Sequence, residues 1–441
     1  MKTRLPHLCL LTLFLILPLA ACGEVPTAQP ENPPTPTSVP PTLPPTTAAL
    51  LLTPSPTPLP TLPRSPRPTQ PPSPTPWVVQ PTPYAPAESL SATLPSVVYA
   101  VQRPEQPAQL WNLRYESGLL REELLLDLSP ESLQNKIGSE SHLGYARVEK
   151  VVFSLDSRYV ALGLESDEGI GATAVVRIAD GTVLLPPPPE HDLNGFLAWI
   201  PGREEFVWQG AFGMNWGSQA LDGSSYTRYT LAHDVLDAVV SPDGARVIFS
   251  ATPSEDIWLG AIDVDGTNLT IYPVPAPLPG LRARNLELSP NGQSCAFTWN
   301  RQVSYRGEGQ IWVMNADGSN QRPLGSAAAY DYDLAWSPDG STIAFARWDN
   351  PDPNARSANR ADWISSLWLV DVESGQERQL LGSAGQYAHW SPRWLPDGSG
   401  LLLLSTRGGA ADLWIVRPDG TGLQPLTRQG GLAGEIAVPA P

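Results

Sequence analysis

One hairpin pattern recurs along the second half of the chain. "DLAWSPDGSTIAFA" begins at Asp333, "DAVVSPDGARVIFS" at Asp237 and "NLELSPNGQSCAFT" at Asn285. In each copy an apolar strand leads into a turn in which Pro presets φ, Asp or Asn hydrogen-bonds nearby backbone, and Gly accepts positive φ. The strand after the turn is β-branched and aromatic-rich. Such self-similarity predicts a repeat architecture in which each copy is one supersecondary unit.

Each unit extends beyond this first hairpin. A second hairpin with a Gly-containing turn follows, as in "IWVMNADGSNQRPL" from Ile311 and "LWIVRPDGTGLQPL" from Leu413. The unit is therefore predicted to be four short antiparallel strands, called a to d from the first to the last. Six first turns are present, two of them degenerate, and they begin at Ser154, Ile200, Ser241, Ser289, Ser337 and Leu395.

These motifs resemble those of a known family. W-S-P-D-G-x-x-I-A-F followed by L-W-x-x-D-x-x-[DS]-G is similar to the TolB-like, WD-repeat-related β-propeller family, over residues 96–441 and most strongly over 237–428. The resemblance implies an all-β propeller. Three segments that begin at Val97, Gln109 and Leu119 have the pattern of strands b, c and d without an a. We expect "EIAVPAP" from Glu435 to supply that strand, which closes a ring of seven blades and leaves no open end. Six and eight blades stay open as alternatives.

The N-terminus has the pattern of an export signal. Lys2 and Arg4 precede an apolar stretch, residues 8–17, that is too short for a comfortable membrane span. Leu19-Ala20-Ala21-Cys22 then resembles the lipobox of bacterial lipoproteins, in which the cysteine sulfur takes a diacylglyceryl group. We predict a signal peptide over 1–21, a membrane anchor at Cys22 and a domain outside the cytoplasm. An ordinary signal peptide with a chance cysteine is the alternative.

Residues 22–95 are dominated by Pro, Thr and Ser, as in "TPSPTPLPTLPRSPRPTQPPSPTP". Each Pro removes a backbone donor, and too few apolar residues are present for a core. This segment is predicted to be a disordered, extended stalk that lifts a domain off a membrane. A passive linker or a Pro-rich docking motif are the other interpretations.

Composition excludes several function classes. The net charge of −16 disfavours binding to nucleic acid or to anionic lipid surfaces. Once Cys9 leaves with the signal and Cys22 is acylated, Cys295 is the cysteine that is left, so no disulfide is expected. Cys295 aligns with an apolar repeat position and is predicted to be buried. The sequence contains no G-x-S-x-G elbow and no phosphate-binding Gly loop. The Asp-Gly turns lack the acids of a calcium loop.

The candidate site lies on one predicted face of the propeller. The b–c and d–a connections vary in length and include a long insertion from Arg347, so they are the expected place for a binding surface, here called the mouth face. The four histidines outside the signal have different offsets from the turns, so no metal site and no cofactor are expected, and no catalytic residue is assigned. The possible ligand-binding residues are Asp234, Arg282, Arg284, Asp331, Asp333, Trp348, Trp363 and His389.

The sequence thus predicts a monomeric, surface-anchored lipoprotein whose propeller is a non-catalytic recognition or scaffold module. Its partner is expected to be an envelope protein, peptide or glycan. Two alternatives stay open: a polysaccharide lyase or hydrolase that uses the mouth, and a purely structural spacer. Fold alone does not decide among them.

Overall fold

The structure is a computed structural model. It describes residues 85–86, 94–103, 106–129, 147–154, 156–165, 171–184, 195–210, 215–229, 234–252, 258–274, 281–301, 309–326, 330–349 and 360–438. All of these fall within one compact unit, Thr75–Pro441. The signal peptide, Cys22 and all but four residues of the proposed stalk lie outside the described residues, as do His142, His191 and His233.

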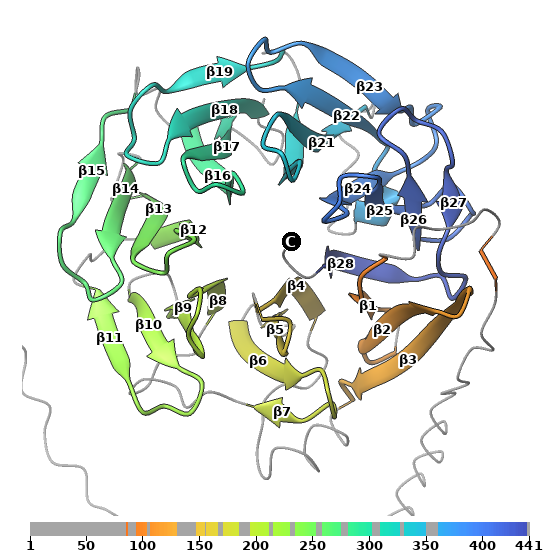
Figure 1. Cartoon of the computed structure of the whole chain (residues 1–441), viewed down its shortest axis with the longest axis horizontal. Coiled ribbons are helices and arrows are strands. Elements are labelled where there is room, and N and C mark those ends of the chain that lie inside the picture. Colours follow the sequence, from red (N-terminus) through yellow and green to blue (C-terminus); the bar gives the residue numbers. More distant parts are fainter. Residues whose placement is uncertain are drawn as a thin grey trace, which may run out of the picture. The chain divides into compact units, whose positions relative to one another are not determined.

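Seven four-stranded antiparallel sheets form a closed ring (Figure 1). The all-β, seven-bladed propeller is thereby confirmed. Blade 1 contains β28 (Leu432–Ala437), β1 (Val97–Val101), β2 (Gln109–Glu116) and β3 (Leu119–Asp127); blade 2 contains β4 (Arg147–Phe153), β5 (Tyr159–Glu165), β6 (Gly171–Arg177) and β7 (Val183–Leu184). Blade 3 contains β8 (Gly195–Trp199), β9 (Glu205–Gln209), β10 (Trp216–Ala220) and β11 (Tyr226–Tyr229); blade 4 contains β12 (Asp234–Val240), β13 (Arg246–Thr252), β14 (Trp258–Asp263) and β15 (Thr270–Tyr272).

The other three blades follow in chain order. Blade 5 contains β16 (Leu281–Leu288), β17 (Ser294–Arg301), β18 (Gly309–Asn315) and β19 (Arg322–Leu324). Blade 6 contains β20 (Asp331–Trp336), β21 (Thr342–Trp348), the 3₁₀ turn η2 (Arg360–Asp362), β22 (Ser365–Asp371) and β23 (Glu377–Leu381). Blade 7 contains β24 (His389–Trp394), β25 (Leu401–Ser405), β26 (Asp412–Val416) and β27 (Gln424–Pro425). In the described part of the chain, no helix has the length and apolar character of a membrane span.

The ring closes through strands from the two ends of the repeat region. β28 pairs antiparallel with β1, and the pairs include Tyr99 with Ile436 and Val101 with Leu432. β28 is the first strand of blade 1, as the sequence predicted, although it begins at Leu432 rather than at Glu435. The closing strand thus protects the edge that β1 would otherwise expose.

The repeated turn is explained by hydrogen bonds within and between blades. In blade 6 the Ser337 hydroxyl donates to Asp339 Oδ1 at 2.5 Å, and the Thr342 amide donates to Ser337 Oγ at 3.0 Å. Gly340 has a φ of 72°, which a residue with a side chain rarely adopts. Trp336 Nε1 donates to the Glu287 carbonyl of the neighbouring blade at 3.1 Å. The W-S-P-D-G motif therefore specifies the fold rather than a ligand.

Aspartates of the a–b and c–d turns share one local arrangement. Each accepts the backbone N–H of the residue two positions later, which is the bond that defines an Asx turn. Hydrogen bonds to the ionised carboxylate hold the pKa of Asp243, Asp265 and Asp339 below the ordinary value. The aspartates with this bond are Asp156, Asp180, Asp222, Asp243, Asp265, Asp317, Asp339, Asp397 and Asp419.

The core lies between adjacent blades. At one such interface, Ile311 and Val313 of blade 5 belong to the same buried cluster as Leu334 and Phe345 of blade 6. Cys295 is fully buried, and burial raises the pKa of its thiol well above the ordinary range. The prediction that Cys295 is a buried apolar residue is confirmed.

Candidate functional site

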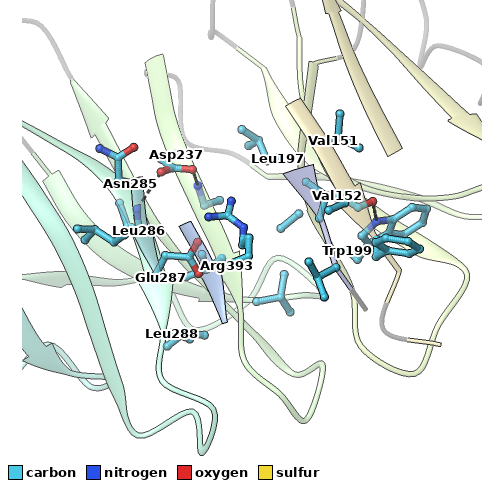
Figure 2. A pocket seen from close by; sticks show the side chains of 18 of the residues that line it. Val151, Val152, Leu197, Trp199, Asp237, Asn285, Leu286, Glu287, Leu288 and Arg393 are labelled. Atoms are coloured by element: carbon cyan, nitrogen blue, oxygen red, sulfur yellow. Dashed lines mark hydrogen bonds between the residues drawn. The ribbon is translucent and has the colours of Figure 1, made fainter. Parts of the chain in front are cut away.

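The a strands of all seven blades line a central channel with a cavity of about 400 Å³. The two sides of this cavity differ in character (Figure 2). Asp237, Asn285 and Glu287, from β12 and β16, lie on one side with Leu286 and Leu288, whereas the residues labelled on the other side, from β4 and β8, are apolar. The channel can therefore hold a ligand with one polar and one apolar side.

A bulge interrupts each a strand at the channel wall. β20, for example, shifts register between Tyr332 and Ala335. The bulge residues Asn285, Asp333 and Ser391 have φ values of 54°, 53° and 51°, a left-handed conformation that is uncommon without glycine. Strain of this kind persists only where surrounding contacts compensate for it.

Side chains at the bulges connect neighbouring blades and supply that compensation. The Leu286 amide donates to Asp237 Oδ2 at 2.9 Å, and the Ser391 amide donates to Asp333 Oδ2 at 2.9 Å. The Ile436 amide donates to Ser391 Oγ at 3.2 Å. Asp333, a predicted ligand residue, thus holds blade 7 against blade 6.

Asp333 also connects the channel wall to the insertion of blade 6. Arg360 Nη1 lies 2.5 Å from Asp333 Oδ2, and the guanidinium carbon lies 5.5 Å from the centre of the Tyr332 ring. Arg360 belongs to η2, in the long b–c connection that the sequence predicted. This ion pair was not predicted, because no local pattern identified Arg360.

Asp331 lies in a buried network of three charges. Arg347 contacts it through Nε to Oδ1 at 2.7 Å and through Nη2 to Oδ2 at 3.0 Å, and its Nη1 donates to Glu377 Oε2 at 3.0 Å. Burial raises the pKa of Asp331 to about 6, although the bonds from Arg347 oppose that rise. Burial also opposes ionisation of Glu377, but the bonds from Arg347 outweigh it and hold its pKa below the ordinary value. Arg347 therefore forms ion pairs with both carboxylates.

His389 is the first residue of β24 and is fully buried. Its Nε2 lies 3.4 Å from the Gly382 carbonyl, and its Nδ1 has no hydrogen-bond partner among the residues that the structure describes. Burial lowers the pKa of His389 to about 4, so the imidazole is neutral at pH 7. The sequence predicted that His389 lies in the connection before β24. The structure instead places it in the strand, because β24 pairs with β25 on both sides of its bulge and so begins before the apolar residues that marked it in the sequence.

We expect the stability that His389 contributes to be lost in mild acid. The unfolded imidazole titrates near 6.5 and the native one near 4, so this stability is complete above pH 6.5 and falls as the pH drops towards 4. The difference in unfolding free energy between wild type and His389→Leu should change by about 3 kcal/mol from pH 7 to pH 4. Denaturant unfolding over that range measures it. Asp331, whose raised pKa acts in the opposite direction, cancels in this difference. A difference independent of pH would contradict the prediction.

Trp348 and Trp363 belong to an aromatic cluster, defined here as Tyr330, Tyr332, Trp348 and Trp363. The ring centroids of the two tryptophans are 5.9 Å apart, and Tyr330 packs edge-on to Trp348 at 6.0 Å. Tyr332 is buried, whereas the other three rings are partly exposed. The cluster therefore attaches the insertion to blade 6 and still presents ring surface at the mouth face.

The remaining predicted residues lie on the first strands of blades 4 and 5. Arg282 and Arg284 are in β16; Arg282 is half-buried and Arg284 is exposed. Asp234 begins β12, and its side chain is outside the described part of the structure. Within the described ranges, no group of three His, Cys, Asp or Glu side chains is placed to hold a metal ion.

Sequence reasoning predicted Asp333 but missed Asp237 and Asn285, the other polar residues at this position of the channel. All three stand four residues before the turn serine, and this common position is the signal that could have identified the other two. Arg393 also lines the cavity, but nothing in the repeat marks it.

Comparison with known proteins adds to this picture. No protein-family model matches the chain. A TolB homologue of Chlorobium luteolum is 27% identical over 36% of this chain and 32% of its own length. The Tol-Pal system protein TolB of Gluconobacter oxydans is 28% identical over 24% of this chain and 20% of its own. The chain is a TolB-like β-propeller.

The TolB-like propeller matches only about a third or less of the length of these two relatives. Among solved structures, a candidate 6-phosphogluconolactonase of Bacteroides fragilis superposes with a TM-score of 0.51 at 13% identity. The match covers 79% of this chain and 99% of that one. At such identity the match supports the fold of the TolB-like propeller alone.

Proposed function

We propose that this chain is a non-catalytic recognition module of the bacterial cell envelope. Its propeller binds an envelope component at the mouth of the channel, and acylated Cys22 holds it at the membrane. The observation that carries the proposal is the sequence match of the repeat region to TolB proteins, one of which is named as part of a Tol-Pal system. The channel, with one polar and one apolar side, supports it.

The side chains that could act in catalysis at the mouth already have structural contacts. Asp331 and Asp333 bond arginines, and His389 is buried and neutral. A general acid or base must reach a substrate proton, and these groups instead stabilise strand pairs and blade contacts. This arrangement favours binding over catalysis.

A capture experiment tests recognition at the mouth face. The immobilised full-length chain is offered solubilised envelope material from the source cells, and the retained components are identified. We expect a retained component to be lost by Arg284→Glu combined with Arg407→Glu, both on the mouth face. Arg203→Glu combined with Arg417→Glu makes the same charge change at the turns and should retain it. Loss through the turn variant alone would refute the placement of the site.

Anchoring needs its own test. With a labelled fatty acid fed to the source cells, wild type should carry label and sediment with membranes, whereas Cys22→Ala should do neither. Equal label on both proteins would rule out the acyl anchor at Cys22, because that variant lacks the acceptor thiol.

A further inference from the structure

Two arginines of the mouth face lack the acidic partners that other arginines of the propeller have. At the turns, Arg158 lies 2.8 Å from Glu204, and Arg177 lies 3.1 Å from Asp180. On the mouth face, within the described ranges, Arg282 and Arg284 have no ion pair and no side-chain hydrogen bond. An acidic chain that leaves two neighbouring arginines without a counter-ion offers a place for an anion.

These two arginines lie beside the aromatic cluster. They are two residues apart on β16, before its bulge, so their side chains are on the same side of the strand. Arg282 pairs with Asn300, Asn300 pairs with Gly309, and Gly309 forms a parallel bridge with Tyr330. The arginines of blade 5 and the aromatic cluster of blade 6 therefore lie at the same level of neighbouring blades.

We infer that the unpaired arginines of β16 and the adjoining aromatic cluster form a subsite for a saccharide that carries carboxylates. Arg284, with Arg282 next to it, pairs with a carboxylate of the sugar chain. The partly exposed rings of Trp348 and Trp363 pack against a sugar ring. This inference rests on the proposed function and names the chemical class that the mouth recognises.

Nearby acids favour an acidic saccharide over an acidic polypeptide. Asp349 and Asp362 are exposed on the described parts of the insertion. Sugar hydroxyls can donate hydrogen bonds to these carboxylates, whereas the ionised side chains of a polypeptide rich in Asp or Glu have no donor to offer them. Arginine, carboxylate and aromatic ring together match the mixed surface of a uronate chain.

Binding of defined oligomers tests the inference. The full-length chain is titrated by calorimetry with galacturonate, glucuronate and mannuronate oligomers, with their methyl esters, and with polyglutamate. We expect saturable binding of at least one uronate oligomer, and about tenfold or more weaker binding of its neutral ester. Arg284→Gln should bind the acid oligomer more weakly by the same factor, and its affinity for the ester should change little. Arg203→Gln, exposed at a turn, should bind as wild type does.

The outcomes separate this inference from the proposed function. No binding of any uronate, equal binding of acid and ester, or equal binding of polyglutamate would overturn the saccharide assignment. If the envelope component in the capture experiment still depends on Arg284 and Arg407, the recognition proposal stands without it. Arg284 is exposed, so its replacement should leave the melting temperature unchanged and the comparison valid.

Discussion

Deletion of residues 432–441 will lower the melting temperature of the propeller by about 10 °C or more. The deletion removes β28, which pairs with β1 and buries Leu432, Ile436 and Ala437. Each large apolar side chain that loses its burial costs about 1.5–3 kcal/mol, and the lost pairing exposes the edge of β1 in addition. Differential scanning calorimetry of the full-length and truncated chains measures the change.

A shorter deletion is the matched control. Removal of residues 440–441 leaves β28 whole and should preserve the melting temperature. Ile436→Asn keeps the chain length but places an amide in the closing strand, and it should destabilise in the same direction as the long deletion. If the chain that lacks residues 432–441 has the same melting temperature as wild type, closure by β28 does not stabilise the ring.

Replacement of Arg347 by Met will cost about 3–5 kcal/mol of unfolding free energy. The side chain is 11% exposed and binds Asp331, which is fully buried, and Glu377. Its loss leaves two carboxylates close together without a cation. The guanidinium also lies 4.6 Å from the Trp368 ring centre, a contact that Met replaces only in part. Urea unfolding at pH 7 measures the cost.

Two further variants show whether charge is the cause. Arg347→Met combined with Asp331→Asn and Glu377→Gln removes the uncompensated charges and should recover part of the loss. Arg246→Met breaks an ion pair with Asp263 whose atoms are 3.9 Å apart at the surface, and it should cost less than about 1 kcal/mol. If Arg347→Met and Arg246→Met lower the unfolding free energy equally, the buried network stabilises the fold no more than a surface ion pair does.

The blade count and turn positions were predictable because each depends on a few adjacent residues. A Ser-Pro-Asp-Gly turn needs only its own hydroxyl, carboxylate and positive φ, as at Ser337 and Gly340. The residue at which the first strand of each blade begins was less predictable. The bulge at Asp333 breaks the alternation of side chains, so the apolar pattern ends there although pairing continues to Asp331.

The candidate site was predictable only in part, because its contacts join distant residues. Arg347 and Glu377 are 30 residues apart, and Asp333 and Ser391 are 58 apart. No period or motif encodes such a pair. The sequence identified Asp331 and Asp333 by their charge before a strand, but it did not predict that arginines would occupy them. Arg282 and Arg284, by contrast, were identified by the same reasoning and have no such partner among the described residues.

The most direct test of recognition at the mouth face is photo-crosslinking in living source cells. A photoreactive amino acid replaces Arg407, in a mouth connection, or Asp397, in a turn on the opposite face, and adducts are compared after illumination. Recognition at the mouth face predicts a discrete adduct with an envelope component from position 407 and none from position 397. A discrete adduct from 397 with none from 407 would contradict it, because the turns would then be the binding face.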